Sequence, residues 1–178
     1  YSFMHNFLPK QYYFIDQFDK KNIDKLKINT GIIYRNYTDK LDKKLILELK
    51  RYCKKKGLKF FISNNFKIAH QLKLDGVYIP SFNINFRHLN YQVRKNFIII
   101  GSAHNIKEIR IKELQKINLI FLSSIFKKNK NYLGVNKFQN IKKITKAKVI
   151  VLGGVSKKNV KKLKMLNCFG FAGISYFK

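Results

Sequence analysis

The stretch KVIVLGGVSKKNVKKL, residues 148–163, places two adjacent glycines directly after an apolar, β-branched run. Such a run predicts a buried strand, and the basic segment after it has the spacing of a helix. Glycine permits a positive φ and lets an anion approach the backbone closely. The pair therefore indicates either a tight strand-to-helix turn or one half of a phosphate site, with Ser156 as the expected N-cap of the next helix.

The same alternation of apolar runs and helical segments continues along the whole chain. Eight strands are predicted, at residues 11–16, 31–36, 59–63, 76–80, 96–101, 119–124, 148–153 and 169–175. Helical spacing is found at residues 43–57, 64–75, 106–118 and 156–167. Strands that are apolar on both faces and alternate with helices predict a parallel sheet covered by helices, and eight of them close a (β/α)₈ TIM barrel. An open doubly wound sheet is the alternative, but its G-x-G-x-x-G turn is absent.

The length of 178 residues and the hydrophobic fraction of 46% suit one domain, which we expect to span residues 1–178. The sequence reaches Lys178 soon after the eighth predicted strand, so the barrel is expected to lack its final helix. We expect residues 2–9 or a partner chain to cover the face that this helix would otherwise cover.

The charge of the chain is strongly unbalanced, with 38 basic and 9 acidic residues and a net charge of +29. This balance suits nucleic acid or an anionic surface. Lys, Asn, Ile, Phe and Tyr dominate, however, and only five basic residues are Arg, which favours A/T-rich codon usage over a selected binding surface. Cys53 and Cys168 are isolated and no signal-peptide pattern is seen, which predicts a cytoplasmic protein. No apolar run reaches the length of about 20 residues that a membrane span needs.

Glycines also mark the end of the last predicted strand, where Gly173 precedes Ile174 and Ser175. In a barrel the active site lies at the carboxyl ends of the strands, and phosphate commonly sits after the seventh and eighth. We therefore predict that phosphate binds between Gly153–Gly154 and Gly173–Ser175.

Five segments at predicted strand ends resemble the thiamine phosphate synthase family, which includes the TenI-type thiazole tautomerases. They are DGVYIPS (75–81), GSAHNIKEI (101–109), LSSIF (122–126), LGGVSKKN (152–159) and FAGIS (171–175). The resemblance implies a barrel that couples a pyrimidine-methyl pyrophosphate to a thiazole phosphate and releases pyrophosphate. The resemblance implies that the partners are these phosphorylated small molecules and not nucleic acid or a membrane. It leaves open whether the chain forms a homodimer.

The resemblance also carries over to individual residues. Arg35 and Ser102 match groups that bind the pyrophosphate substrate, while Gly154, Ile174 and Ser175 match groups around the thiazole phosphate. Lys130, in a charged loop after the sixth strand, is predicted to help stabilise the departing pyrophosphate. The predicted catalytic set is thus Arg35, Ser102 and Lys130.

Other positions depart from the family pattern. The two magnesium-binding aspartates correspond here to Asn64 and Asn83, whose amide oxygens carry no charge, so Mg²⁺ is expected only together with substrate or not at all. Ordinary turn asparagines are the alternative. Ile33 and Tyr37 replace a glutamine and a lysine, and Ser124 stands where the tautomerase has its histidine. Two alternatives to the synthase therefore remain: a non-catalytic barrel that binds phosphorylated thiazole or pyrimidine, and a basic nucleic-acid-binding protein.

Overall fold

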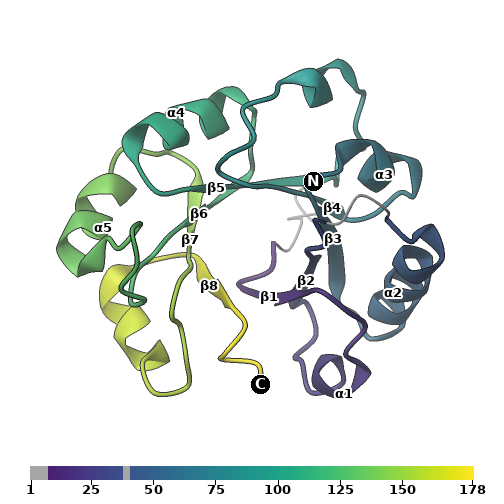
Figure 1. Cartoon of the computed structure of the whole chain (residues 1–178), viewed down its shortest axis with the longest axis horizontal. Helices are drawn as coiled ribbons and strands as arrows, with labels where there is room; N and C mark the ends of the chain where they lie inside the picture. Colours follow the sequence, from purple (N-terminus) through teal and green to yellow (C-terminus); the bar gives the residue numbers. More distant parts are fainter. Residues whose placement is uncertain (1–7, 38–40) are drawn as a thin grey trace, which may run out of the picture.

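Eight parallel strands form a closed barrel in the computed structural model, which describes residues 8–37 and 41–178. Each strand pairs with its sequence neighbours, and β1 pairs with β8 to close the ring. The helices surround the strands, which confirms the predicted (β/α)₈ fold (Figure 1). The strands are β1 Gln11–Ile15, β2 Gly31–Tyr34, β3 Lys59–Ser63, β4 Gly76–Ile79, β5 Ile98–Ala103, β6 Leu119–Leu122, β7 Lys148–Val151 and β8 Gly170–Gly173.

The helices differ more than the strands from what the sequence predicts. They are α1 Lys20–Ile23, α2 Lys43–Lys55, α3 Phe66–Gln71, α4 Ile106–Leu114 and α5 Gly134–Lys142, with 3₁₀ helices η1 Arg87–Asn90 and η2 Val160–Leu166. Helices α1 and α5 were not predicted from the sequence. Within the described residues no helix combines the length and the hydropathy that a membrane span requires.

The predicted helix at residues 156–167 is wrong in type and in its start. Ser156 does not cap it: the Ser156 backbone N–H donates to Asn159 Oδ1 at 2.9 Å, and the Ser156 carbonyl accepts from the N–H of Asn159 and of Val160. This local turn delays the helix to Val160, where it begins as a 3₁₀ helix. The β7 tip is therefore followed by a turn and not directly by a helix N-terminus.

Alternate residues of each strand face two separate apolar clusters. On β1, Tyr12 and Phe14 belong to the cluster inside the barrel, whereas Tyr13 and Ile15 belong to the cluster between strands and helices. Rings dominate the inside: Phe121 lies 5.0 Å from Tyr12 and 6.1 Å from Phe14, measured between ring centroids. The barrel interior is thus a packed core, and a ligand would lie at an end of the barrel rather than between its strands.

Aromatic residues after β8 cover the face for which the sequence predicted residues 2–9 or a partner chain. The ring centroid of Phe177 lies 5.1 Å from that of Tyr13, and Tyr176 lies 4.7 Å from Phe171. Of the predicted N-terminal cover, residues 2–7 lie outside the described residues, and Leu8 packs on the interior cluster instead. The turn after β8 thus folds its own rings back onto β1 and β8. Cover by residues 2–7 or by a partner chain stays a prediction.

Candidate functional site

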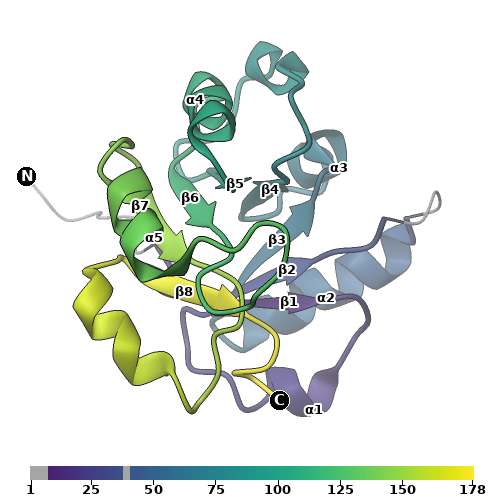
Figure 2. The ribbon, with the colours of Figure 1, turned by 60° about the vertical axis from the view of Figure 1, so that its left-hand side comes forward.

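The predicted site residues lie at one end of the barrel, because all eight strands are parallel and share the end at which their carboxyl termini lie (Figure 2). Each belongs to a strand tip or to the connection after it: Arg35 after β2, Asn64 after β3, Asn83 after β4, Ser102 in β5, Lys130 after β6, Gly153 and Gly154 after β7, and Gly173, Ile174 and Ser175 at the end of β8. The barrel mouth, as we call this end, therefore brings the whole predicted set together.

Arg35 presents its guanidinium above the ring of Phe14. Its backbone N–H donates to the carbonyl of Ile15 at 2.8 Å, which continues the β1–β2 ladder by one residue. The guanidinium carbon lies 5.1 Å from the centroid of the Phe14 ring, and Arg35 is exposed. A cation held by a ring face and open to solvent is suited to a forked contact with phosphate oxygens.

Ser102 and Tyr78 form a buried polar pair beneath the mouth. Burial raises the pKa of Tyr78 to about 12, and a hydrogen bond with the Ser102 side chain counteracts part of this rise. Tyr78 is therefore a neutral hydroxyl at physiological pH, which can donate or accept a hydrogen bond and does not act as a base. Arg35 and Tyr37 also influence Tyr78 electrostatically, so these side chains lie near one another.

Tyr37 and Phe82 form an aromatic pair that the sequence did not indicate. Their ring centroids lie 6.0 Å apart in an edge-on arrangement, and the Tyr37 hydroxyl lies 3.4 Å from Ser63 Oγ. Both rings are exposed, 55% for Tyr37 and 65% for Phe82. Because they follow β2 and β4, no local pattern in the sequence could have paired them.

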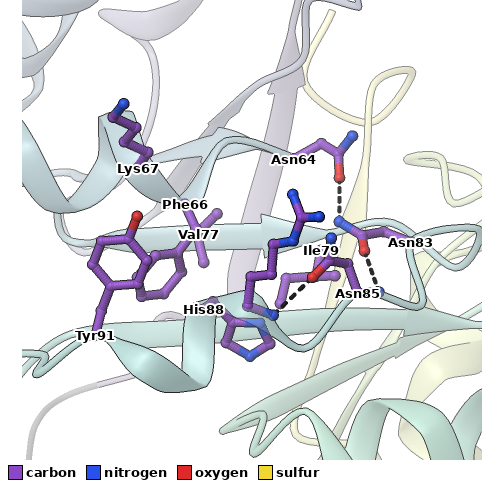
Figure 3. A pocket seen from close by; sticks show the side chains of 10 residues that line it. Asn64, Phe66, Lys67, Val77, Ile79, Asn83, Asn85, His88 and Tyr91 are labelled. Carbon is purple, nitrogen blue, oxygen red and sulfur yellow. Dashed lines mark hydrogen bonds between the residues drawn. The ribbon is translucent and has the colours of Figure 1, made fainter.

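Asn64 and Asn83 are hydrogen-bonded to each other. Asn83 Nδ2 donates to Asn64 Oδ1 at 2.6 Å, and Asn83 Oδ1 accepts from the backbone N–H of Asn85 at 2.8 Å (Figure 3). Both amide oxygens are thereby engaged, and no group of three His, Cys, Asp or Glu side chains in the described part of the chain could hold a metal. Since Mg²⁺ requires several free oxygens in octahedral geometry, these residues as placed do not fit a magnesium site.

A cavity of about 190 Å³ lies beside this amide pair, on the outside of the barrel. Its apolar lining includes Val77 and Ile79 of β4, together with Phe66 and Tyr91, as Figure 3 shows. Here the chain between β4 and β5 forms only the short η1. On this side, therefore, a cavity and not a packed helix lies next to the amide pair.

The tips of β7 and β8 present backbone groups instead of side chains. Gly153 and Gly154 have φ values of 100° and 79°, which other residues rarely adopt. Within residues 8–37 and 41–178, no acceptor takes the N–H groups of Gly153, Gly154, Ile174 and Ser175. Gly154, Ile174 and Ser175 are exposed. Free, accessible N–H groups on neighbouring strand tips suit an anion such as phosphate.

The glycines also have a packing role that the sequence did not reveal. The carbonyl of Gly153 accepts from the N–H of Phe126 at 3.0 Å and of Lys127 at 3.3 Å. A Cβ on Gly154 would lie 2.7 Å from the backbone nitrogen of Lys127, and one on Gly153 would lie 2.8 Å from Ser124 Cα. The connection between β6 and α5 thus lies against the β7 tip. This connection also contains the exposed Lys130.

Helix α4 buries a lysine that its sequence pattern did not indicate. The apolar Ile106 and Leu114 are 50% and 63% exposed, whereas Lys112 and Gln115 are fully buried. Burial lowers the pKa of Lys112 to about 8, although Glu108 favours its charged form. The only signal in the sequence is that Lys112 follows the buried Ile109 by three residues, on the same side of the helix.

Comparisons with known proteins agree with this architecture. The family model of thiamine monophosphate synthase (TMP-TENI) matches residues 25–177. The thiamine-phosphate synthase of Methanococcus vannielii is 28% identical over 65% of this chain, and that of Helicobacter pylori strain J99 is 29% identical over 75%. The matches span 58% and 64% of those two relatives, less than two thirds of each.

The solved structures similar to this chain support the fold. The thiamine phosphate pyrophosphorylase of Pyrococcus furiosus has a TM-score of 0.74 at 17% identity, with 93% of this chain and 85% of that chain covered. The corresponding protein of Bacteroides thetaiotaomicron has a TM-score of 0.63 at 16% identity, with 95% and 84% covered. Since the family model matches most of the sequence, this chain belongs to the thiamine monophosphate synthase (TMP-TENI) family.

Proposed function

We propose that this chain acts as a thiamine phosphate synthase that couples a pyrimidine-methyl pyrophosphate to a thiazole phosphate and releases pyrophosphate. Its membership of the family and its similarity to thiamine-phosphate synthases support this proposal. The observation that carries it is the set of backbone N–H groups at the β7 and β8 tips that have no acceptor in the described part of the chain and lie at the same barrel end as Arg35. One anion site and one separate cation suit two substrates that each carry phosphate.

In the reaction, the bond between the pyrimidine methylene carbon and the pyrophosphate oxygen breaks, and that carbon forms a new bond to the thiazole nitrogen. Pyrophosphate leaves with the bonding electrons, so catalysis depends mainly on stabilising negative charge and on positioning. Arg35 would contact the departing pyrophosphate, and the Gly153–Gly154 and Ile174–Ser175 N–H groups would hold the thiazole phosphate. The Tyr37–Phe82 pair would bound the space above Ser63, where a flat heterocycle could lie against the rings.

Magnesium has no role in the free protein in this proposal. The Asn64–Asn83 pair has both amide oxygens engaged and offers the Nδ2 hydrogens of Asn64 as donors. Hydrogen-bond donors on the protein stabilise phosphate oxygens directly, whereas carboxylate oxygens would do so by binding a cation between them. The pair would therefore contribute hydrogen bonds where the family pattern has metal-binding aspartates.

The same amide pair favours a second candidate function, a non-catalytic barrel that binds phosphorylated thiazole or pyrimidine. Two carboxylates and a lysine of the family pattern are absent, and without them binding is retained more easily than catalysis. The backbone site at β7 and β8 does not depend on those side chains. Under this alternative, thiazole phosphate binds but no coupled product forms.

One experiment distinguishes the two candidates. Purified protein is incubated with both precursors, with magnesium or with a chelator, and thiamine phosphate is measured by chromatography. Binding of thiazole phosphate is measured in parallel by calorimetry. Product in both conditions supports the proposed synthase, and binding without product supports the non-catalytic barrel. Absence of both product and binding would refute both candidates.

A further inference from the structure

Lys112 of α4 is a buried lysine whose ammonium is bound by uncharged oxygens. It is 0% exposed and forms no ion pair among residues 8–37 and 41–178. Its Nζ donates to the backbone carbonyl of Asn83 at 2.6 Å and to Gln115 Oε1 at 2.9 Å. Removing an ammonium from water is costly unless its hydrogen bonds are replaced, so these two oxygens are what make the buried position tolerable.

Gln115 holds the same segment through its own amide. Its Nε2 donates to the carbonyls of Asn83 at 3.0 Å and Asn85 at 2.8 Å, and its backbone carbonyl pairs with His88 Nε2 at 2.8 Å. The end of α4 therefore contacts the chain between β4 and β5 at three residues, Asn83, Asn85 and His88. The carbonyl of Asn83 receives two of these bonds, one from Lys112 and one from Gln115.

Apart from the contacts with α4, short-range hydrogen bonds hold this segment: the Asn83 N–H donates to the Pro80 carbonyl at 3.1 Å, and the Arg87 N–H donates to Asn85 Oδ1 at 2.7 Å. Phe82 and Ile84, on either side of Asn83, are 65% and 63% exposed, and the cavity of about 190 Å³ lies beneath Asn83 and Asn85. The side chain of Asn83 nevertheless reaches Asn64 at 2.6 Å. The orientation of Asn83 thus depends on its backbone, which is bound by α4 from behind.

We propose that Lys112 is a positioning residue of the barrel mouth, and that its ammonium acts as a built-in cation that, with Gln115, fixes residues 83–85 and keeps Asn83 against Asn64. Gly101 provides the room for this side chain, because a Cβ there would lie 3.0 Å from Lys112 Cδ. The consequence for catalysis rests on the proposed function, whereas the structural role of Lys112 does not.

The test uses Lys112→Met, which keeps an apolar stem of similar length and removes the charge. Gln115→Leu removes the second donor and serves if the first variant folds poorly. The matched control is Lys142→Met, since Lys142 Nζ also donates to two backbone carbonyls, of Leu166 at 2.7 Å and of Asn167 at 2.6 Å, on another part of the barrel. Global unfolding in urea verifies that each variant is folded.

Cleavage by an arginine-specific protease reports on this segment, because the chain has only five arginines and Arg87 lies just after residues 83–85. Cleavage after Arg87, followed by mass spectrometry, is expected to accelerate at least about tenfold in Lys112→Met and in Gln115→Leu. In Lys142→Met it should stay within about twofold of wild type. A wild-type cleavage rate in both Lys112→Met and Gln115→Leu, or equal acceleration in Lys142→Met, would overturn the proposal.

Coupling kinetics test the link to function. In Lys112→Met the KM for the pyrimidine pyrophosphate is expected to rise about tenfold, with little change in the KM for thiazole phosphate. An unchanged KM for the pyrimidine pyrophosphate would refute the positioning role at the mouth even if cleavage accelerates. If the wild-type protein forms no thiamine phosphate, the proposed function fails, and the cleavage rates alone decide whether Lys112 fixes residues 83–85.

Discussion

The two sides of the barrel mouth are built from different chemistry. At the β3 and β4 tips, side chains form the surface: Asn64 and Asn83 bond to each other, and Lys112 holds the backbone behind them. At the β7 and β8 tips, the surface consists of backbone N–H groups exposed by Gly154 and Ser175. The side built from side chains is also the one that departs from the family pattern. A substitution changes what a side chain offers, whereas a backbone N–H survives most substitutions.

The largest expected effect is on stability at the backbone side. Gly154→Val would place a β-branched side chain at a φ of 79° and 2.7 Å from the Lys127 nitrogen. Strain and overpacking together should lower the free energy of unfolding by about 4 kcal/mol. Urea denaturation measures this. A loss below roughly 1 kcal/mol would show that the β6–α5 connection moves away without cost.

The next largest effect concerns Arg35. Arg35→Ala should lower the rate of thiamine phosphate formation about a hundredfold, or roughly 3 kcal/mol, by analogy with the loss of one donor to a developing negative charge. Arg51→Ala, which removes an exposed arginine from α2, is the control and should be neutral. Equal rates for the two variants would remove Arg35 from the site.

Gly173→Ala separates anion binding from turn geometry. Gly173 has no positive φ, and an added Cβ would meet Val155 O at 3.7 Å and Val155 Cβ at 4.0 Å, both ordinary contacts, so the fold should persist. If phosphate lies between the β7 and β8 tips, the methyl group should weaken thiazole phosphate binding about tenfold, or roughly 1.4 kcal/mol. Calorimetry measures the affinity, and unchanged binding in a stable variant would place the phosphate elsewhere.

The amide pair can be reverted to carboxylates. In Asn64→Asp with Asn83→Asp, the 2.6 Å hydrogen bond becomes a contact between like charges, so the free protein should lose stability. Magnesium at about ten times its dissociation constant should restore roughly 1.4 kcal/mol through binding to the folded state. Thermal unfolding with and without magnesium measures both effects.

Asn136→Asp with Asn140→Asp, on the exposed face of α5, is the matched change of two charges and should show no magnesium effect. Magnesium stabilisation of the wild-type protein equal to that of the reverted variant would contradict the view that the amide pair offers no metal site.

The smallest effect is expected for Lys130. Its side chain is exposed, so its contribution to leaving-group stabilisation is screened by solvent and salt. Lys130→Ala should reduce the coupling rate about twofold at low salt and not measurably at high salt. A reduction of a hundredfold, or one that salt does not alter, would mean that the β6–α5 connection closes on the substrate.

The sequence predicted the strands well because each is a short apolar run that both barrel faces bury. It predicted helix faces poorly where tertiary contacts decide burial. On α4 the apolar Ile106 and Leu114 face solvent, while Lys112 is buried because it meets a carbonyl 29 residues earlier in the chain. No local pattern contains that oxygen.

The same limit applies to the site. Asn64 and Asn83 could be placed at strand tips from their positions after apolar runs, but not paired with each other. The glycines after β7 could be recognised as permissive, but the β6–α5 connection that lies against them could not. Strand tips follow from local periodicity, whereas contacts between tips depend on how the barrel closes.

Barrel closure itself has a kinetic consequence. The contact between β1 and β8 joins Gln11 to Phe171, the largest sequence separation of any strand pair in the barrel, while every other pair joins neighbours in the chain. Contacts of long sequence separation form late because the chain loses much entropy to close them. We therefore expect the β1–β8 junction to form last and to open first. The rings of Tyr13, Phe171 and Phe177 along it would then govern how long the closed barrel persists once folded.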